Sequence, residues 1–315
     1  MVITDERWYS DIADAIRTLN ACDEHYAPSQ MADAILSLPI RANINYFADY
    51  LAESAPSMRY LIGNSATQIT NPMSMNATLE YVMYPRVSLI SDYAFYYCSS
   101  LSTARFPRCV TVGRSAFYRC SALSVIDLAA CVTVSDYAFA YCSSLKAVSL
   151  PSCETVGSSA FYACPSLELV SMPRCVSVYQ FAFAMCSTIT SVYLPECRVI
   201  SNRAFSRCDA LSSVLLEACE TVGQYAFQSC SSLSTVTLPM CRTLSDMAFY
   251  GCVSLTRLDL TGVESVPNLY SSTVFYSTPI GGYGGYGSVY VKAAMYDAFL
   301  ADPVWAMLSN RIAIA

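Results

Sequence analysis

Cysteine is the residue type whose spacing in this chain most clearly suggests chemistry. From Cys98 to Cys252 a cysteine stands at every eleventh position, so that Cys22 alone falls outside the series. Thiols in such numbers could form disulfides, bind zinc or, beside a base, act as nucleophiles. Each of these uses needs its own spacing, so the elements that carry the cysteines decide among them.

Two sequence contexts alternate along the series, so the repeating unit is twenty-two residues long. In one context a leucine or isoleucine follows the cysteine three positions later, and in the other a proline usually stands two positions before it. The unit also carries an alanine-phenylalanine pair, and eight copies are explicit, at Ala94-Phe95, Ala116-Phe117, Ala138-Phe139, Ala160-Phe161, Ala182-Phe183, Ala204-Phe205, Ala226-Phe227 and Ala248-Phe249. Weaker copies precede and follow them, over 79–90 and 255–266.

A fixed period in the twenties with apolar residues at set places is typical of a solenoid, in which each coil buries its apolar face against its neighbours. Segments such as Val148-Ser149-Leu150 alternate apolar and polar residues, which is the period of a strand. We therefore predict an α/β solenoid of 22-residue coils, with one short strand per coil stacked into a parallel sheet.

This arrangement argues against cysteine chemistry. Equivalent cysteines of adjacent coils would lie about one strand spacing apart, but with parallel side chains that do not turn toward each other. No Cys-x-x-Cys pair suited to zinc occurs. The prediction is that the thiols are reduced and buried as small hydrophobic groups.

The sequence predicts no enzyme, and hence no catalytic residue, metal site or cofactor. A cysteine or serine nucleophile would need a base, and the only histidine, His25, lies in the region before the repeats. Asp127 and Asp259 fall five coils or more apart, too far for the paired carboxylates of a glycosidase. The glycine-rich stretch 281–287 lacks the lysine and serine of a phosphate-binding loop.

Three regions are expected. Residues 1–58 form a helical N-terminal segment, because apolar residues recur at helical spacing over 8–19 and 31–38; residues 59–280 form the solenoid; and residues 281–315 form a loop rich in glycine and tyrosine, a final strand and a helical cap. In the cap a helix should run from Ala293 through Trp305 to Ile312, and Asp302-Pro303 should restart it as N-cap and first residue.

The composition limits the classes of partner that the chain could bind. The net charge is −6 and only 13% of the residues are charged, which argues against nucleic acid. No apolar run is long enough to cross a bilayer, and the first residues lack the features of a secretory signal. The expected localisation is therefore a virion tail or a bacterial cell surface reached by another route.

Ligand-binding candidates are the side chains that point outward from the strands and the tyrosines of the C-terminal loop. The strand row contributes Arg105, Asp127, Tyr193 and Asp259, and the loop contributes Tyr283 and Tyr286. A second varied set flanks the alanine-phenylalanine pair, namely Tyr93, Tyr96, Tyr97, Tyr118, Tyr137, Tyr141, Tyr162 and Tyr225. These rings offer contact area at low entropic cost, or they pack between coils.

The unit from Cys142 through Leu145, Val148, Leu150-Pro151 to Ala160-Phe161 resembles the BspA-like class of bacterial leucine-rich repeats. The resemblance covers about half the chain and implies a surface-exposed recognition or adhesion module of bacteria, their phages or certain protozoa. The chain departs from that class in placing cysteine at the Pro-x-Cys position, where a small aliphatic residue is more common.

The segments 11–17 and 26–35 resemble a short element of bacteriophage and prophage tail proteins. This resemblance implies a phage tail-associated, host-binding protein, held by other tail proteins through its N-terminal segment and binding a bacterial surface protein or glycan. The alternatives are a structural or decoration subunit of a virion that forms homo-oligomers, and a bacterial surface adhesin of the BspA kind.

Overall fold

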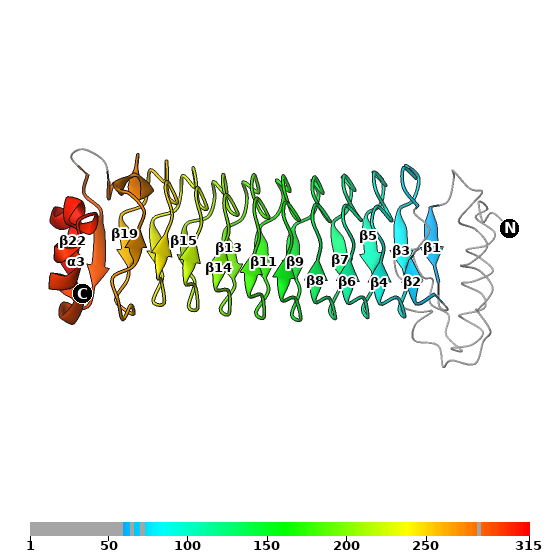
Figure 1. The fold of residues 1–315 in the computed structure, drawn as a ribbon. Coiled ribbons are helices and arrows are strands. Elements are labelled where there is room, and N and C mark those ends of the chain that lie inside the picture. Colours follow the sequence, from blue (N-terminus) through cyan, green and yellow to red (C-terminus); the bar gives the residue numbers. More distant parts are fainter. Residues whose placement is uncertain (1–58, 64–65, 70–72, 282–284) are drawn as a thin grey trace, which may run out of the picture.

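A computed structural model describes residues 59–63, 66–69, 73–281 and 285–315 of the chain. Their coils stack side by side in chain order, from β1 near one end to β22 and α3 at the other (Figure 1). The parallel solenoid predicted from the 22-residue period is confirmed. The helical segment predicted for 1–58, with Cys22 and His25, lies outside the described residues.

Each coil carries two short strands rather than the single strand expected. The longer strands are β1 (Tyr60–Ile62), β3 (Tyr81–Met83), β5 (Thr103–Arg105), β7 (Val125–Asp127), β9 (Ala147–Ser149), β11 (Leu169–Ser171), β13 (Ser191–Tyr193), β15 (Ser213–Leu215), β17 (Thr235–Thr237) and β19 (Arg257–Asp259), followed by β21 (Ser288–Val291) and β22 (Ile312–Ile314). The two-residue strands are β2 (Gln68–Ile69), β4 (Leu89–Ile90), β6 (Thr111–Val112), β8 (Thr133–Val134), β10 (Thr155–Val156), β12 (Ser177–Val178), β14 (Val199–Ile200), β16 (Thr221–Val222), β18 (Thr243–Leu244) and β20 (Asn268–Leu269).

All described strand pairs are parallel, and most join residues one coil apart in sequence, as Thr155 and Ser177 do. The two-residue strands form one ten-stranded sheet, and the longer strands form three consecutive sheets of four, three and five strands. The second strand went unpredicted because a two-residue strand is too short to show an alternating pattern.

The core is a set of rows that run along the solenoid, because equivalent residues of successive coils face the same interior. One phenylalanine of each coil is buried, and Phe139, Phe161, Phe183 and Phe205 stack with ring centroids 5.2 Å apart and nearly parallel planes. The stack continues in both directions, from Phe95 to Phe275. Offset stacking of aromatic rings adds to the free energy gained from burying them.

The turn that contains the alanine-phenylalanine pair is held by bonds between coils. The backbone N–H of Phe161 donates to the carbonyl of Ala182 in the next coil at 2.8 Å, while that of Tyr162 donates to Ser159 within the turn at 3.1 Å. This alternation requires left-handed backbone at Ser159 (φ 56°) and Ala163 (φ 53°), and the equivalent residues of the other described coils share it. The left-handed conformation costs about 1 kcal/mol or more per non-glycine residue, which the inter-coil bonds offset.

Both cysteine rows are buried, and each thiol donates to a backbone carbonyl. In the row followed by leucine the bond joins two coils, as from Cys164 Sγ to the carbonyl of Phe139 at 3.2 Å. In the Pro-x-Cys row it stays within the coil, as from Cys153 Sγ to Thr155 at 3.4 Å. All fifteen described cysteines are free thiols, as the sequence predicted, and burial raises the pKa of Cys109 to about 11 and of Cys153 to about 12.

Aspartate or asparagine in one coil is paired with glycine in the next. Asp136 Oδ1 accepts the backbone N–H of Ser158 at 2.8 Å, next to Gly157. A Cβ atom at Gly157 would lie 2.7 Å from the backbone nitrogen of Asp136, so only glycine fits. The same bond recurs from Arg114 to Asp92 and from Gln224 to Asn202, beside Gly113 and Gly223. This close approach repeats at several coil junctions without occurring at every one.

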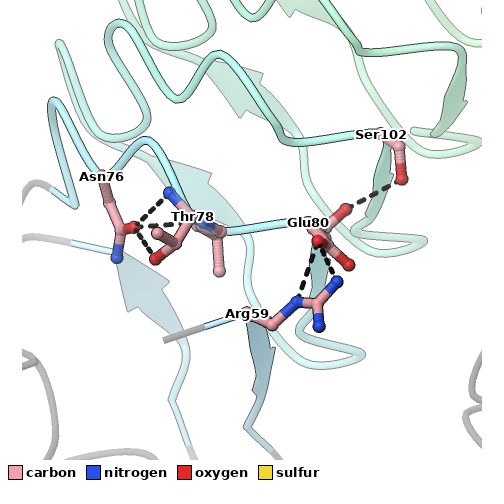
Figure 2. Close-up of polar contacts among 6 residues, drawn as sticks. Arg59, Asn76, Thr78, Glu80 and Ser102 are labelled. Atoms are coloured by element: carbon pink, nitrogen blue, oxygen red, sulfur yellow. Dashed lines mark hydrogen bonds and ion pairs between the residues drawn. The ribbon is translucent and has the colours of Figure 1, made fainter. Parts of the chain in front are cut away.

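The first described coils are joined by polar contacts around Glu80 (Figure 2). Arg59 Nε donates to the Glu80 carboxylate at 2.9 Å, and the Ser102 hydroxyl of the following coil donates to the Glu80 carbonyl at 3.0 Å. Asn76 Oδ1 accepts the backbone N–H groups of Thr78 and Leu79, which fixes the turn before β3. These bonds link three successive coils at the N-terminal end of the described solenoid.

The C-terminal cap differs from the predicted helix. After the 3₁₀ turn η1 (Ser272–Phe275) and strand β21 come η2 (Ala293–Met295), the short helix α3 (Tyr296–Ala301) and η3 (Trp305–Arg311). Ile312, expected in the helix, begins β22, which pairs with β21 and extends the sheet by one strand. Asp302 Oδ1 accepts the backbone N–H groups of Val304 and Trp305, but η3 begins at Trp305 with Val304 as its N-cap, so Asp302 and Pro303 lie before the positions predicted for them.

Trp305 closes the end of the core. Its ring is fully buried against Phe275, the last ring of the stack, and Phe299 of α3, and its indole N–H donates to the carbonyl of Pro267 at 2.8 Å. The cap thereby covers apolar surface that a further coil would otherwise cover.

We expect the buried thiols to be unreactive in the folded chain. A Cys22→Ser variant, which retains the fifteen described cysteines, should release less than one equivalent on titration with dithiobis(nitrobenzoate) at pH 8, and fifteen equivalents in guanidinium chloride. The unmodified chain provides the control for Cys22. Rapid labelling of several thiols in the native variant would show that the cysteine rows are accessible.

Removing one ring from the middle of the stack should cost the most stability. Phe183→Ala is expected to lower the free energy of unfolding by about 3–5 kcal/mol, because it leaves a cavity between Phe161 and Phe205. The matched control is Leu169→Ala, whose side chain is 52% exposed and should cost less than about 0.5 kcal/mol. Urea unfolding followed by circular dichroism measures both, and equal costs would contradict a continuous core.

Gly157→Ala should destabilise the chain by about 2 kcal/mol or more, because the new methyl group would overlap the Asp136 backbone. Gly251→Ala is the control. Its backbone is left-handed (φ 73°), but a Cβ there would meet nothing closer than Ser229 Oγ at 3.4 Å, so the cost should be only about 1 kcal/mol. A larger loss at Gly251 in thermal unfolding would contradict the close coil contact.

Candidate functional site

The predicted strand-row residues do not converge on one site. Arg105 in β5 and Asp127 in β7 are direct neighbours in register. Tyr193, three coils further along in β13, is 57% exposed, and Asp259 lies in β19 beyond it. The row is therefore spread along the length of the solenoid.

Asp259 is occupied within its own coil. Its carboxylate accepts bonds from Arg257 Nη2 at 2.9 Å and from the Thr261 hydroxyl at 2.7 Å. Partial burial raises the pKa of Asp259, but the hydrogen bonds from Thr261 and Arg257 outweigh it, so the pKa lies below its usual range. Arg257 also lies over the ring of Tyr290, 3.9 Å from its centroid. Arg257 therefore joins the last coil to β21, and the Asp259 carboxylate is hydrogen-bonded to it.

The other candidates are a short apolar patch and the C-terminal loop. Tyr193 and Leu215 hold the same place in successive coils, and Leu215 is 52% exposed. In the loop, Tyr286 is 75% exposed, whereas Tyr283 lies outside the described residues. None of these side chains has a described contact with another candidate.

The turns that contain the alanine-phenylalanine pair form a continuous aromatic surface, here called the tyrosine ridge. It consists of Tyr93, Tyr96, Tyr97, Tyr118, Tyr137, Tyr141, Tyr162, Phe181, Tyr225, Tyr250 and Tyr276 together with Arg114, Arg119 and Arg203. All eight tyrosines singled out from the sequence belong to it. Each ring is exposed or half-buried. The rings therefore both pack between coils and face outward, so the two interpretations of these tyrosines are compatible.

Contacts run along the ridge from coil to coil. Tyr96 and Tyr118 stack with centroids 5.2 Å apart, and Tyr118, Tyr141 and Tyr162 follow in edge-to-face contacts at 5.4 and 5.5 Å. Beyond Phe181, which meets Tyr162 at 6.5 Å, the rings of Tyr225, Tyr250 and Tyr276 continue the row. Neighbouring rings therefore fix each other's positions, and the surface is preorganised.

Arginines fill gaps in this aromatic row. The Arg119 guanidinium carbon lies 5.2, 5.8 and 5.1 Å from the ring centroids of Tyr97, Tyr118 and Tyr141. Arg203 likewise lies between Phe181 and Tyr225, at 5.6 and 4.7 Å. Sequence reasoning missed these arginines, although Arg119 stands one repeat after Tyr97 and one repeat before Tyr141.

The surroundings shift the pKa of several groups of the ridge. Interaction with Tyr97 raises the pKa of Arg119. Partial burial, followed by the neighbouring tyrosines, raises the pKa of Tyr96 and Tyr141. The guanidinium of Arg119 is thus a cation held against aromatic rings, which is an electrostatically favourable arrangement.

Within the described ranges, no three histidine, cysteine, aspartate or glutamate side chains come together in a group that could hold a metal ion. Among the same residues, no helix is long and apolar enough to span a membrane.

Comparison with known proteins identifies the repeat. The sequence profile described as "BspA type Leucine rich repeat region" matches residues 67–180 and 154–280. A search of the curated proteins found no match.

Among solved structures, the chain is similar to a leucine-rich repeat protein from Bacteroides ovatus, with 22% identity and a TM-score of 0.48. The match covers 68% of this chain and 66% of the Bacteroides protein, which is slightly less than two thirds of that protein's length. It is also similar to a leucine rich cell surface protein from Faecalibacterium prausnitzii (16% identity, TM-score 0.40, 76% of this chain and 81% of that one) and to the pneumococcal vaccine antigen PcpA (15%, 0.38, 86% and 82%). Likenesses at this level do not transfer a function.

The profile match and the stacked 22-residue coils agree with each other. Since the profile covers more than half of the sequence, the chain belongs to the BspA-type leucine-rich repeat family.

Proposed function

We propose that this protein is a non-enzymatic recognition protein, an adhesin of the bacterial BspA surface type, and that it binds its target through the tyrosine ridge. The observation that carries the proposal is the chain of ring–ring and arginine–ring contacts from Tyr93 to Tyr276, in which Arg203 bridges Phe181 and Tyr225, on an outward-facing side of a regular solenoid. Tyrosine supplies a large amphipathic contact area with little loss of side-chain entropy, which suits it to binding surfaces.

The backbone beneath the ridge supports this role. Phe117, Phe139 and Phe161 of successive turns donate N–H bonds to the next coil at 2.7–2.8 Å, so each turn is anchored at its centre. A ligand that spans several coils would therefore meet side chains that are already ordered, and association would cost little conformational entropy. The strand row offers no comparable contact network, and Asp259 is already hydrogen-bonded within it.

The phage-tail hypothesis depends on other parts of the chain. Its motif lies within residues 11–35, outside the described structure, so it stays a prediction, as do attachment to tail proteins and the role of a self-associating decoration subunit. Family membership favours the surface adhesin over these alternatives.

Location separates the two recognition hypotheses. For an adhesin, antibodies against the solenoid should label intact, uninfected cells that express the chain. Mass spectrometry of virions purified from the same strain is the complementary measurement. If the chain is found in the virions and the antibodies do not label intact cells, the protein is a phage component and not an adhesin.

Binding through the ridge can be tested with fluorescently labelled protein on a panel of bacterial and epithelial cells. Replacing the exposed rings in Tyr93→Ser/Tyr137→Ser should reduce cell binding at least tenfold, because both rings contribute to the ridge. Tyr193→Ser, which removes an exposed tyrosine from the strand row, is the matched control and should leave binding within twofold. The reverse outcome would assign recognition to the strand face.

A further inference from the structure

The N-terminal part of the tyrosine ridge contains a cation that lacks a carboxylate partner. Arg119 is exposed, and within the described residues it makes no ion pair. Other arginines of the solenoid do: Arg174 pairs with Glu154 at 3.2 Å, and Arg242 lies 3.5 Å from Glu220. Arg119 hydrogen-bonds to Tyr118 and lies over the rings of Tyr97 and Tyr141, but no described carboxylate neutralises its charge, so its remaining N–H groups can bind an external anion.

We infer that this part of the ridge, centred on Arg119, binds an acidic polysaccharide, with the guanidinium pairing with a carboxylate or sulfate group and the surrounding tyrosines packing against the sugar rings. The inference rests on the proposed function, in which the ridge is the recognition surface, and it specifies the chemical class of the ligand.

The aromatic surroundings prepare Arg119 for this role. Tyr97 and Tyr141, from the coils before and after, flank the guanidinium at 5.2 and 5.1 Å, which limits the conformations of a long side chain. Guanidinium is weakly hydrated and planar, so it tolerates contact with rings while its N–H groups remain available for two parallel bonds to an anion. Little entropy is then lost when the anion binds.

The tyrosines match the rest of such a ligand. A pyranose ring presents C–H groups on its faces and hydroxyl groups at its edge, which complement the face and the phenolic tip of a tyrosine. From Tyr96 through Tyr118 and Tyr141 to Tyr162 one ring follows another in successive coils at 5.2, 5.4 and 5.5 Å, close to the length of one sugar unit. Arg114, which lies 6.0 Å from the Tyr137 ring, supplies a second exposed cation on the same turns.

The same surface fits a nucleic acid poorly. Asp92 and Asp136 are exposed immediately before Tyr93 and Tyr137, so carboxylates alternate with the arginines along these turns. A phosphate at every nucleotide would be repelled by them, and the chain carries a net charge of −6. A polysaccharide with sparser charges can place its anion at Arg119 and a neutral sugar beside Asp92 or Asp136.

Biolayer interferometry with the full chain tests the inference. The immobilised probes are hyaluronan, which carries one carboxylate per disaccharide, κ-carrageenan, which carries one sulfate per disaccharide, dextran as the neutral polymer and single-stranded DNA as a phosphate polymer. We expect binding to at least one of the first two, weakening with added salt, and at least tenfold weaker binding to dextran and DNA. The preferred probe identifies the anionic group.

Variants then locate the site. Arg119→Gln should weaken binding to the preferred probe at least tenfold, and Arg119→Lys should weaken it less, because the charge remains but the planar fork is lost. The matched control is Arg207→Gln. Arg207 occupies the same place four coils later, is exposed and has the same left-handed backbone (φ 61°), but it makes no described ring contact. Its loss should change affinity less than twofold.

Several results would overturn the inference. These are equal binding of dextran, equal binding of DNA, or equal effects of Arg119→Gln and Arg207→Gln. Cell binding can also depend on Tyr93 and Tyr137 and yet be unaffected by Arg119→Gln and by excess hyaluronan or κ-carrageenan. That result would refute the acidic ligand and leave the proposed function intact. Absence of cell binding with retained polysaccharide binding would refute adhesion alone.

Discussion

The structure depends on one constraint: a coil has only its two neighbours with which to bury its core and satisfy its backbone. Phe161 shows both sides of this, since its ring stacks between Phe139 and Phe183 while its N–H donates to Ala182 of the next coil. An interior residue must therefore fit against a copy of itself one coil away. This explains why interior positions hardly vary along the chain, and why a side chain such as cysteine is repeated rather than used once.

The same constraint shapes the surface. Side chains at equivalent places are held about one strand spacing apart, so large outward residues on adjacent coils can contact each other. On the turns this produces the tyrosine ridge, in which Arg119 stands between Tyr97 and Tyr141 because all three share one place in the repeat. Packing between coils and presentation to a ligand are thus not competing roles. The contacts that order the rings also reduce the entropic cost of binding to them.

Periodicity explains what the sequence could predict and what it could not. The 22-residue coil, the parallel strands and the free thiols follow from rows of identical residues, each of which repeats the same signal many times. The two-residue strands show no alternation, and Ile312 carried a helical pattern although its backbone pairs with β21, so both were missed. The setting of Arg119 was overlooked because its aromatic neighbours are adjacent in space but lie a full repeat away in sequence. The bonds of Asp259 to Arg257 and Thr261 could not be predicted either, because they are local and leave no mark on the repeat.

The choice of cysteine for two core rows reflects a balance between packing and reactivity. A thiol is small and apolar enough for a position facing its own copy, and it can donate a weak hydrogen bond, as Cys186 does to the carbonyl of Phe161 at 3.1 Å. An alanine would leave that carbonyl without this donor, and a serine would bury a more polar group. Oxidation proceeds through the thiolate, and burial raises the pKa of Cys98, Cys219 and Cys241 to about 12. The folded solenoid therefore protects its own thiols, whereas an unfolded chain would expose closely spaced cysteines of ordinary pKa. Coil stacking thus keeps the core reduced as well as ordering the ridge.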